Sequence, residues 1–448
     1  EGFLFMRIQL SEHFTYRKLL RFTLPSVIMM VCTSIYGVVD GVFVSNFVGS
    51  DAFAAVNLIM PFLMVLGAVG FMLGTGGSAL VAYTLGAGNE KRANEIFSLL
   101  IYVLIGVGAV FTIGGIAFLT PMSRLLGADE TMLPVCVSYG RIVLLGLIPY
   151  MLQNTFQSFL VTAERPQLGL YVTIAAGVTN IALDALFVAV LQWGAEGAAL
   201  ATILSQFVGG AIPLVYFLRP NSSKLRLGRT AFHGRALLKA CANGSSEFMT
   251  NISMSVVNML YNWQLMRLMG SGGVAVYGVI MYVNFIFIAI FLGYSMGSAP
   301  IVGYHYGAGN RAELRGLLRK SLCIITVMSV VLTAAALLLA RPLSMIFMSK
   351  EATLLPVTIR AFSIYSLSFL MAGYNIYASS FFTALNDGFI SALISFARTL
   401  VFQVAAVIVL PVLWDIDGVW AAVVAAETLA LLLSAACLVG KRKKYGYA

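Results

Sequence analysis

Residues 103–119 read VLIGVGAVFTIGGIAFL and residues 322–340 read LCIITVMSVVLTAAALLLA, and neither stretch contains a charged side chain. A helix needs about 20 predominantly apolar residues to cross the roughly 30 Å hydrocarbon core of a bilayer. Over all 448 residues, 60% are hydrophobic and only 10% are charged, whereas soluble domains are about 25% charged. The sequence therefore predicts an all-α integral membrane protein.

Similar apolar runs recur along the chain, separated by short turns rich in glycine, asparagine and proline. They predict twelve transmembrane helices, near residues 22–47, 53–84, 95–119, 134–162, 168–190, 197–217, 244–268, 273–305, 317–340, 356–383, 389–411 and 418–439. Twelve spans use most of the chain, so we expect no sizeable soluble domain.

The basic residues indicate the topology. Of the 28 lysines and arginines, 21 fall in one alternating set of loops and tails, while only Arg124, Arg341 and Lys350 fall in the opposite set. Because basic loops stay in the cytoplasm, we predict a multi-pass protein of the plasma (inner) membrane with both termini cytoplasmic. The net charge of +10 then reports topology, and we expect no nucleic-acid partner.

The amino terminus carries two further expectations. We expect no cleavable signal peptide, because the first apolar run extends to transmembrane length. The chain begins at Glu1, and Met6 fits a native start, which leaves open whether residues 1–5 are native.

The chain also repeats itself at an offset of 221 residues without a gap. The best-preserved block is the turn at 86–89, which reads Gly-Ala-Gly-Asn and recurs at 307–310. Other matching pairs are Gly49/Gly270, Gly76/Gly297, Tyr83/Tyr304, Asn154/Asn375, Thr162/Thr383, Trp193/Trp414 and Gly197/Gly418. Six spans per half give two parallel, pseudo-symmetric lobes, which we place at residues 1–217 and 244–448, joined by a cytoplasmic linker at 218–243.

Two carboxylates lie inside predicted spans of the first half. Asp40 is about 18 residues into the first span and Asp184 about 17 into the fifth, so both lie roughly 26 Å from the inner end of their helices. Asn180 precedes Asp184 by four residues on the same helix face, and Thr202 reaches a similar depth in the sixth span. Ionisable groups are costly in a bilayer, so this cluster indicates a site for Na⁺, which prefers oxygen ligands, or for H⁺.

The second half lacks this cluster. The residues equivalent to Asp40, Asn180, Asp184 and Thr202 are Tyr261, Val401, Ala405 and Val423. A purely structural polar network would be expected in both halves, whereas a specialised site need occur in only one. Polar residues that merely hold helices together are the competing interpretation.

Taken together, these features resemble the multidrug and toxic compound extrusion (MATE) family over residues 15–440. The resemblance rests on Leu24-Pro25-Ser26 opening the first span, Asp40, the paired Gly-Ala-Gly-Asn turns and Asn180-x-x-x-Asp184. It implies a cation-coupled exporter of small organic, cationic or amphipathic compounds. It also implies an ion site at Asp40, Asn180, Asp184 and Thr202 with Tyr139 nearby, and a bend in the first helix at Pro25. The acidic residues that some branches use in the second lobe have no clear counterpart in Glu247 or Glu427.

Other polar residues are candidates for a substrate cavity between the lobes. These are Gln153, Asn154 and Gln157 in the fourth span, Tyr374 and Asn375 in the tenth, and Met254, whose flexible side chain suits an adaptable wall. Helix–helix hydrogen bonding explains the polar residues about as well, and ordinary lipid-facing or core packing is the favoured explanation for most of the methionines. Arg398 and Glu427 are a candidate ion pair.

The remaining function classes are less favoured. A lipid-linked oligosaccharide flippase of the same superfamily would carry a strongly basic cavity, and here the intramembrane arginines are few and scattered. The segment at 293–297 matches G-x-S-x-G, but it lies inside a predicted span without a base, so we predict no enzyme. There is no P-loop and no Cys/His metal cluster. We therefore expect no cofactor beyond the coupling ion, a membrane-lipid environment and a monomer.

Overall fold

A computed structural model describes residues 7–448, so the question about residues 1–5 lies outside the described part of the chain. All regular secondary structure of residues 7–448 is helical. The first half comprises α1 (Tyr16–Phe47), α2 (Ser50–Gly86), α3 (Glu90–Leu125), α4 (Leu133–Leu145), α5 (Leu147–Thr162), α6 (Pro166–Asp184), the π-helix η1 (Ala185–Val190) and α7 (Gly194–Leu218). The second half comprises α8 (Gly234–Met269), α9 (Ser271–Gly307), α10 (Arg311–Met348), α11 (Leu354–Ser366), α12 (Phe369–Ala384), α13 (Gly388–Phe396), the π-helix η2 (Ala397–Val401) and α14 (Phe402–Tyr445).

These elements make up the twelve predicted spans. Within residues 7–448, eight helices are long and apolar enough to cross a bilayer, and the bent pairs α4–α5 (53°) and α11–α12 (43°) raise the number to ten. The continuous run from α13 through α14 contains two spans, because the backbone leaves the helical conformation at Trp414 and Asp415. The twelfth span is α8, which carries more asparagine and serine than the others. The predicted fold class is confirmed.

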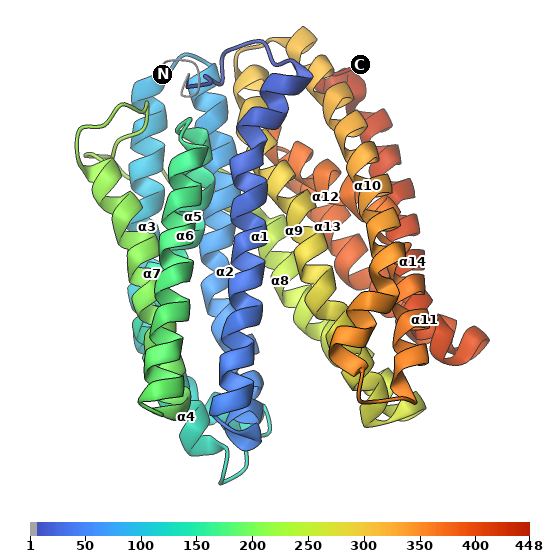
Figure 1. Cartoon of the computed structure of the whole chain (residues 1–448). Coiled ribbons are helices and arrows are strands. Elements are labelled where there is room, and N and C mark those ends of the chain that lie inside the picture. The colour runs from blue at the N-terminus through green and yellow to red at the C-terminus, as the bar shows by residue number, and fades with distance from the viewer. Residues whose placement is uncertain (1–6) are drawn as a thin grey trace, which may run out of the picture.

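The repeat is visible in the helix boundaries. Adding 221 to the first and last residue numbers of α2 gives those of α9, and the same offset relates α4 to α11. Helices α1–α7 form one lobe and α8–α14 the other (Figure 1). Helix α8 already begins at Gly234, so the latter part of the proposed linker 218–243 belongs to a helix.

The two lobes touch through glycines at the end of the molecule that carries both chain termini, which we call the terminal end (Figure 1). A Cβ atom added to Gly86 would lie 1.9 Å from the carbonyl oxygen of Tyr304, and one added to Gly307 would lie 2.0 Å from that of Tyr83. These two contacts are related by the repeat. Only a residue without a side chain allows backbones to approach so closely, so the glycines close this end.

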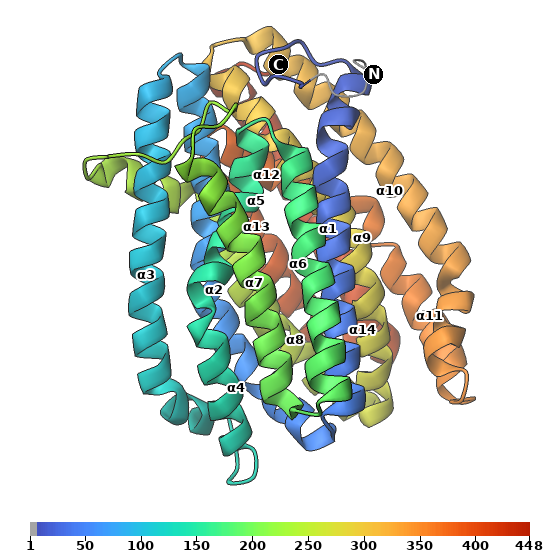
Figure 2. The same cartoon turned by 60° about the vertical axis from the view of Figure 1, so that its left-hand side comes forward.

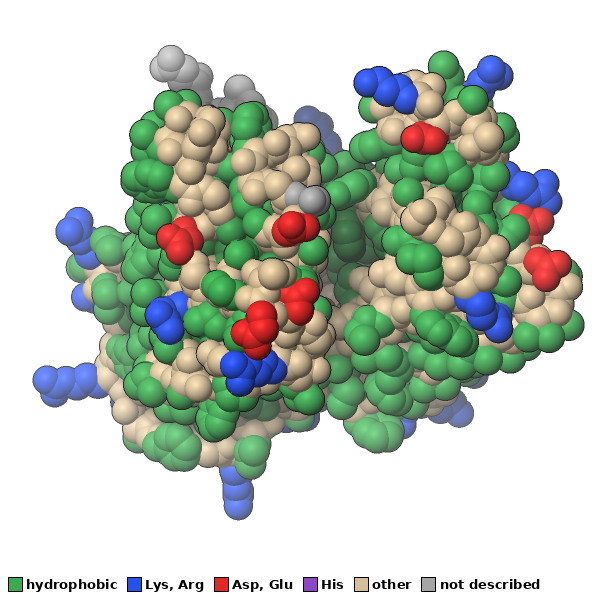
Figure 3. All heavy atoms as spheres, turned by 90° about the horizontal axis from the view of Figure 1, so that it is seen from below, with side chains coloured by type: hydrophobic (Ala, Val, Ile, Leu, Met, Phe, Trp, Pro, Cys, Tyr) green, Lys and Arg blue, Asp and Glu red, His purple; other side chains and the backbone are tan. Residues whose placement is uncertain are grey.

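The opposite end of the molecule is open. Viewed from that side, a deep hollow separates the two lobes (Figure 3). Helices α1 and α6 of the first lobe lie side by side (Figures 1 and 2). They carry Asp40 and Asp184, so the predicted cluster lies on neighbouring helices.

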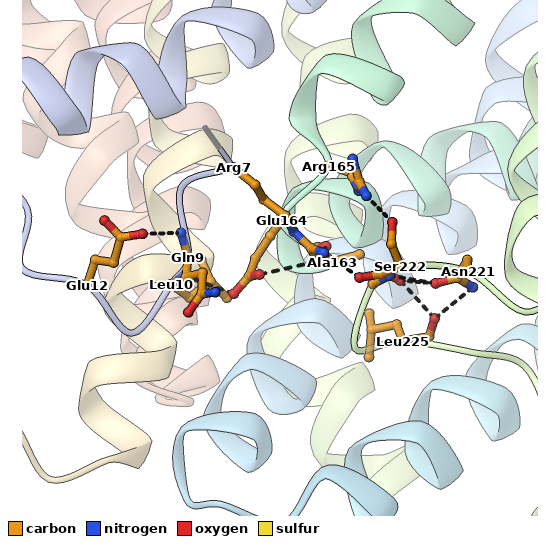
Figure 4. Close-up of polar contacts among 11 residues, drawn as sticks. Arg7, Gln9, Leu10, Glu12, Ala163, Glu164, Arg165, Asn221, Ser222 and Leu225 are labelled. Atoms are coloured by element: carbon orange, nitrogen blue, oxygen red, sulfur yellow. Dashed lines mark hydrogen bonds and ion pairs between the residues drawn. The ribbon is translucent and has the colours of Figure 1, made fainter. Parts of the chain in front are cut away.

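The segment before α1 ties both lobes together at the terminal end. On the first lobe, Glu164 pairs with Arg7 at 3.2 Å and accepts a hydrogen bond from the Leu10 amide at 2.9 Å (Figure 4). On the second lobe, Glu313 at the start of α10 accepts from the Phe14 amide at 2.9 Å and contacts His13 at 2.6 Å. Residues 7–14 therefore form a strap across the closed end.

Candidate functional site

The local structure around Asp184 explains how a carboxylate is held inside the first lobe. Asp184 is the last residue of α6, and the chain continues as the π-helix η1. Short π-helical turns interrupt the regular ladder and occur frequently at functional sites. Asn180 lies one turn earlier on the same face, and both side chains are buried. The spacing that suggested a shared face is therefore realised in the fold.

Three of the four carboxylate oxygens of Asp40 and Asp184 are buried without a hydrogen bond from the protein. Asp40 lies within interaction range of both Asp184 and Asn180. Even so, Oδ1 of Asp40 and both carboxylate oxygens of Asp184 are buried without a hydrogen bond from the protein. Buried polar atoms are almost always satisfied, because burial without a partner is costly. Acceptors left open in this way are suited to a proton or a small cation.

The side chains at this cluster limit which cations could bind there. No group of three or more His, Cys, Asp or Glu side chains within residues 7–448 could hold a metal ion. Two carboxylates with neutral oxygens from an amide and hydroxyls would instead fit a monovalent, hard cation such as Na⁺, or a proton shared between the acids. The residues present fit either coupling ion.

The other predicted members of the cluster lie nearby. Thr202 on α7 lines the same cavity as Asp40 and Asn180, and its hydroxyl donates to the Ala198 carbonyl at 2.9 Å, which leaves the oxygen able to accept. Tyr139 on α4 is buried and lies within electrostatic range of both carboxylates. The structure therefore brings all five predicted residues together.

The cavity at this cluster has a volume of about 190 Å³, and we call it the N-lobe cavity. Gln153, Asn154 and Gln157 line it, as do several residues that the sequence analysis missed, namely Thr33, Tyr36, Gly37, Tyr150, Thr173, Ala176, Gly177, Ser205 and Gln206. The sequence could have indicated Tyr36, because it precedes Asp40 by one helical turn. It could not have indicated that position 177 requires glycine, because this requirement arises from the ring of Tyr36 on another helix.

Pro25 lies inside α1, and its side chain is buried. The helix runs through this position without interruption from Tyr16 to Phe47. Proline removes one hydrogen bond of the helical ladder, so the bend proposed for α1 has a chemical basis at this residue.

A second cavity of about 230 Å³ lies mainly in the second lobe, and we call it the C-lobe cavity. Met254 lines it, together with Met30 and Ser34 of α1. Arg398 and Glu427 also line this cavity, and Nε of Arg398 donates to Oε1 of Glu427 at 2.9 Å. The predicted ion pair is confirmed.

Tyr374 and Asn375, by contrast, line neither cavity. Nδ2 of Asn375 donates to Oε2 of Glu427 at 2.7 Å, and its Oδ1 accepts from Ser434 at 3.0 Å. The Tyr374 hydroxyl bonds Thr326 on α10. Both side chains therefore serve helix–helix contacts, the competing interpretation considered for them.

Comparisons with known proteins agree with the duplicated fold. The sequence model of the MatE family matches residues 25–186 and again 248–409. The chain is 22% identical over 425 residues to the multidrug export protein MepA of Staphylococcus haemolyticus, covering 95% of this chain and 93% of that protein. It is 22% identical over 367 residues to MepA of Staphylococcus aureus, covering 80% of each.

Solved structures share the fold. One is described as the outward-facing conformation of a multidrug resistance MATE family transporter of the MOP superfamily. It superposes with a TM-score of 0.91 at 23% identity, over 99% of this chain and 98% of that one. A MOP superfamily transporter from Pyrococcus furiosus superposes with a TM-score of 0.88 at 22% identity, over 97% of each chain.

Proposed function

Because the chain belongs to the multidrug and toxic compound extrusion family, we propose that it is a secondary active exporter of small organic compounds, driven by H⁺ or Na⁺. The relatives described as multidrug export proteins support efflux as the direction of transport. We place the protein in the plasma membrane with the basic terminal end in the cytoplasm, following the distribution of basic residues. We also propose that it works as a monomer.

In this orientation, the lobes are closed toward the cytoplasm and the hollow between them opens to the outside. Transport then requires the lobes to exchange this arrangement for one that is open to the cytoplasm. An ion promotes this exchange only if it binds the two arrangements with different affinities. We assign that role to the cluster of Asp40, Asn180, Asp184, Thr202 and Tyr139.

The observation that carries the proposal is the set of three buried carboxylate oxygens without a protein partner. A bound proton or Na⁺ would satisfy these oxygens, and its release would leave the two carboxylates repelling each other. Within residues 7–448, the second lobe has no carboxylate oxygen that is buried without a hydrogen-bond partner, and its most deeply buried acid, Glu427, pairs with Arg398. Ion binding is therefore assigned to the first lobe alone.

The test is transport into proteoliposomes with a pH gradient or a Na⁺ gradient imposed separately, using a fluorescent organic cation. We expect one gradient to drive transport, and we expect Asp40→Asn and Asp184→Asn each to abolish it. Asp51→Asn is the matched control, because Asp51 is an exposed acid in the first turn of α2. Normal transport by correctly inserted Asp40→Asn and Asp184→Asn variants would refute the assigned ion site.

A further inference from the structure

The linker that joins the two lobes runs along the side of α3. Near the start of that helix, Oδ1 of Asn94 accepts a hydrogen bond from the Arg226 amide at 2.6 Å. One turn further on, the Ser98 hydroxyl accepts from the Gly228 amide at 3.0 Å. One turn beyond that, the Tyr102 hydroxyl donates to the carbonyl oxygen of the same glycine at 2.8 Å. The linker is therefore fastened to three successive turns of α3.

These contacts place the linker at the surface of the bilayer. A helix rises 1.5 Å per residue, so Tyr102 lies about 18 Å beyond Glu90, the first residue of α3. The charged residues at the start of α3 end at Glu95, and the next one is Arg124. Gly228 therefore lies beside the apolar part of α3, where lipid headgroups meet hydrocarbon. Figures 1 and 2 show the linker projecting sideways past α3, below the upper end of that helix.

The linker continues into α8 with an outer face that is both apolar and basic. In the first turns of α8, Arg235 and Leu238 are exposed at a spacing of three residues, which places them on one face of the helix. Ala236 and Ala240 point the other way and are buried against the first lobe. Leu238 is 71% exposed, and Phe232, just before the helix, is 74% exposed. Such a helix is suited to lie in the plane of a membrane surface.

The charge of this segment indicates which lipids it suits. Residues 219–246 contain six lysines and arginines and no aspartate or glutamate. Lys239 is engaged, because its Nζ donates to the Asn386 carbonyl of the second lobe at 2.6 Å. The side chains of Arg229 and Arg235 are exposed, and neither has a partner among residues 7–448. Exposed apolar side chains beside unpaired arginines match the acyl chains and the phosphates of anionic phospholipid.

We propose that residues 229–239, which we call the linker arm, are a docking surface for anionic phospholipid in the leaflet at the terminal end. Phe232 and Leu238 insert among the acyl chains, and Arg229 and Arg235 bind headgroup phosphates. Because the linker is fastened to α3, docking holds the first lobe to the bilayer surface near the closed end. Only the naming of this leaflet as cytoplasmic rests on the proposed function, since docking is measurable without transport.

The backbone of the linker arm provides the measurement. Within residues 7–448, no acceptor is found for the amides of residues 229–236, the last three of which lie in the first turn of α8. Such amides exchange rapidly with heavy water unless something covers them. The experiment is hydrogen–deuterium exchange of the full chain in nanodiscs of phosphatidylcholine, with or without phosphatidylglycerol. We expect exchange at 229–236 to be at least about fivefold slower with phosphatidylglycerol, the effect of one basic residue at an anionic surface.

Variants then locate the effect. In the double variant Arg229→Gln/Arg235→Gln, we expect exchange at 229–236 to be equally fast in the two bilayers. Arg442→Gln/Lys443→Gln is the matched control, because it removes the same charge from exposed residues in the last turn of α14. The control should retain the slower exchange in phosphatidylglycerol. A lipid effect that survives the loss of Arg229 and Arg235 would overturn their assignment to headgroup phosphates.

The apolar contribution is tested with Phe232→Ser/Leu238→Ser, which should speed exchange in both bilayers without unfolding the protein, because both side chains are largely exposed. Unchanged exchange in this variant would contradict insertion. Equal exchange of the unmodified protein in the two bilayers would overturn docking of anionic lipid, and fast exchange in both would leave the arm to a soluble acidic partner instead. Loss of transport in Asp40→Asn with the lipid effect intact would separate the arm from the proposed ion site.

Discussion

Replacing Gly86 or Gly307 with alanine should disfavour closure of the lobes at the terminal end. At Gly86 the new Cβ would lie 1.9 Å from the Tyr304 carbonyl oxygen, 2.8 Å from its carbon and 3.0 Å from its Cα. These are backbone atoms, so no side-chain rotation relieves the clash. Comfortable non-bonded contact begins near roughly 3.5 Å, so the two helices must separate by about 1.5 Å.

The energetic cost follows from overpacking, which typically amounts to about 1–3 kcal/mol. A difference of this size changes an equilibrium by roughly 5- to 150-fold. The population of the closed arrangement, relative to that of the arrangement open at the terminal end, should fall by this factor. Because the Gly307 contact with Tyr83 mirrors the first one, Gly307→Ala should have an effect of similar size.

The assay is double electron–electron resonance between spin labels at the terminal ends of α3 and α10. Gly86→Ala and Gly307→Ala should shift the distances to longer values and slow dye transport. Gly106→Ala and Gly114→Ala on α3 are matched controls, because an added Cβ meets nothing within 4 Å at either position. Distances and transport in Gly86→Ala that match those of Gly106→Ala would refute the closure mechanism.

Three further predictions concern individual contacts. Glu164→Gln removes the ion pair to Arg7, which is partly exposed, so we expect a loss of closed population of about tenfold at most, measured as increased cysteine labelling at the terminal end. Gly177→Ala places a Cβ 1.9 Å from the ring of Tyr36 and should lower the melting temperature, and Tyr36→Ala in the same chain should restore it. Asn375→Leu leaves buried polar partners unsatisfied and should cost about 1–3 kcal/mol of stability, seen in thermal denaturation in detergent; an unchanged melting temperature would contradict this.

The sequence predicted the elements of the fold because membrane helices are specified locally. The length of an apolar run sets a span, and the 221-residue offset needs only matching positions along the chain. The cluster of Asp40 and Asp184 was also accessible, since equal depth on two helices follows from counting residues from the same side of the membrane. Asn180 followed from its spacing to Asp184.

What the sequence did not show depends on contacts between distant segments. Glu164 reads as an ordinary loop acid, yet it is only 5% exposed and holds the strap through Arg7 and Leu10. Asn375 reads as a cavity residue because it is polar within a span, but its partners lie far along the chain on α14. Spacing along one helix defines a face, and it does not define which helix covers that face.

The two lobes therefore combine one scaffold with opposite polar chemistry. Both contain a π-helical turn at an ionisable residue: buried Asp184 directly precedes η1 in the first lobe, and partly buried Arg398 lies within η2 in the second. In the first lobe both carboxylate oxygens of Asp184 are buried without a hydrogen bond from the protein, which is the feature on which the proposed ion site rests. In the second lobe Glu427 is bound by Arg398 and Asn375, so its charge is fixed by the protein. Duplication has therefore kept the scaffold while the polar side chains diverged: carboxylate oxygens stay open in the first lobe, and the carboxylate of Glu427 is satisfied in the second.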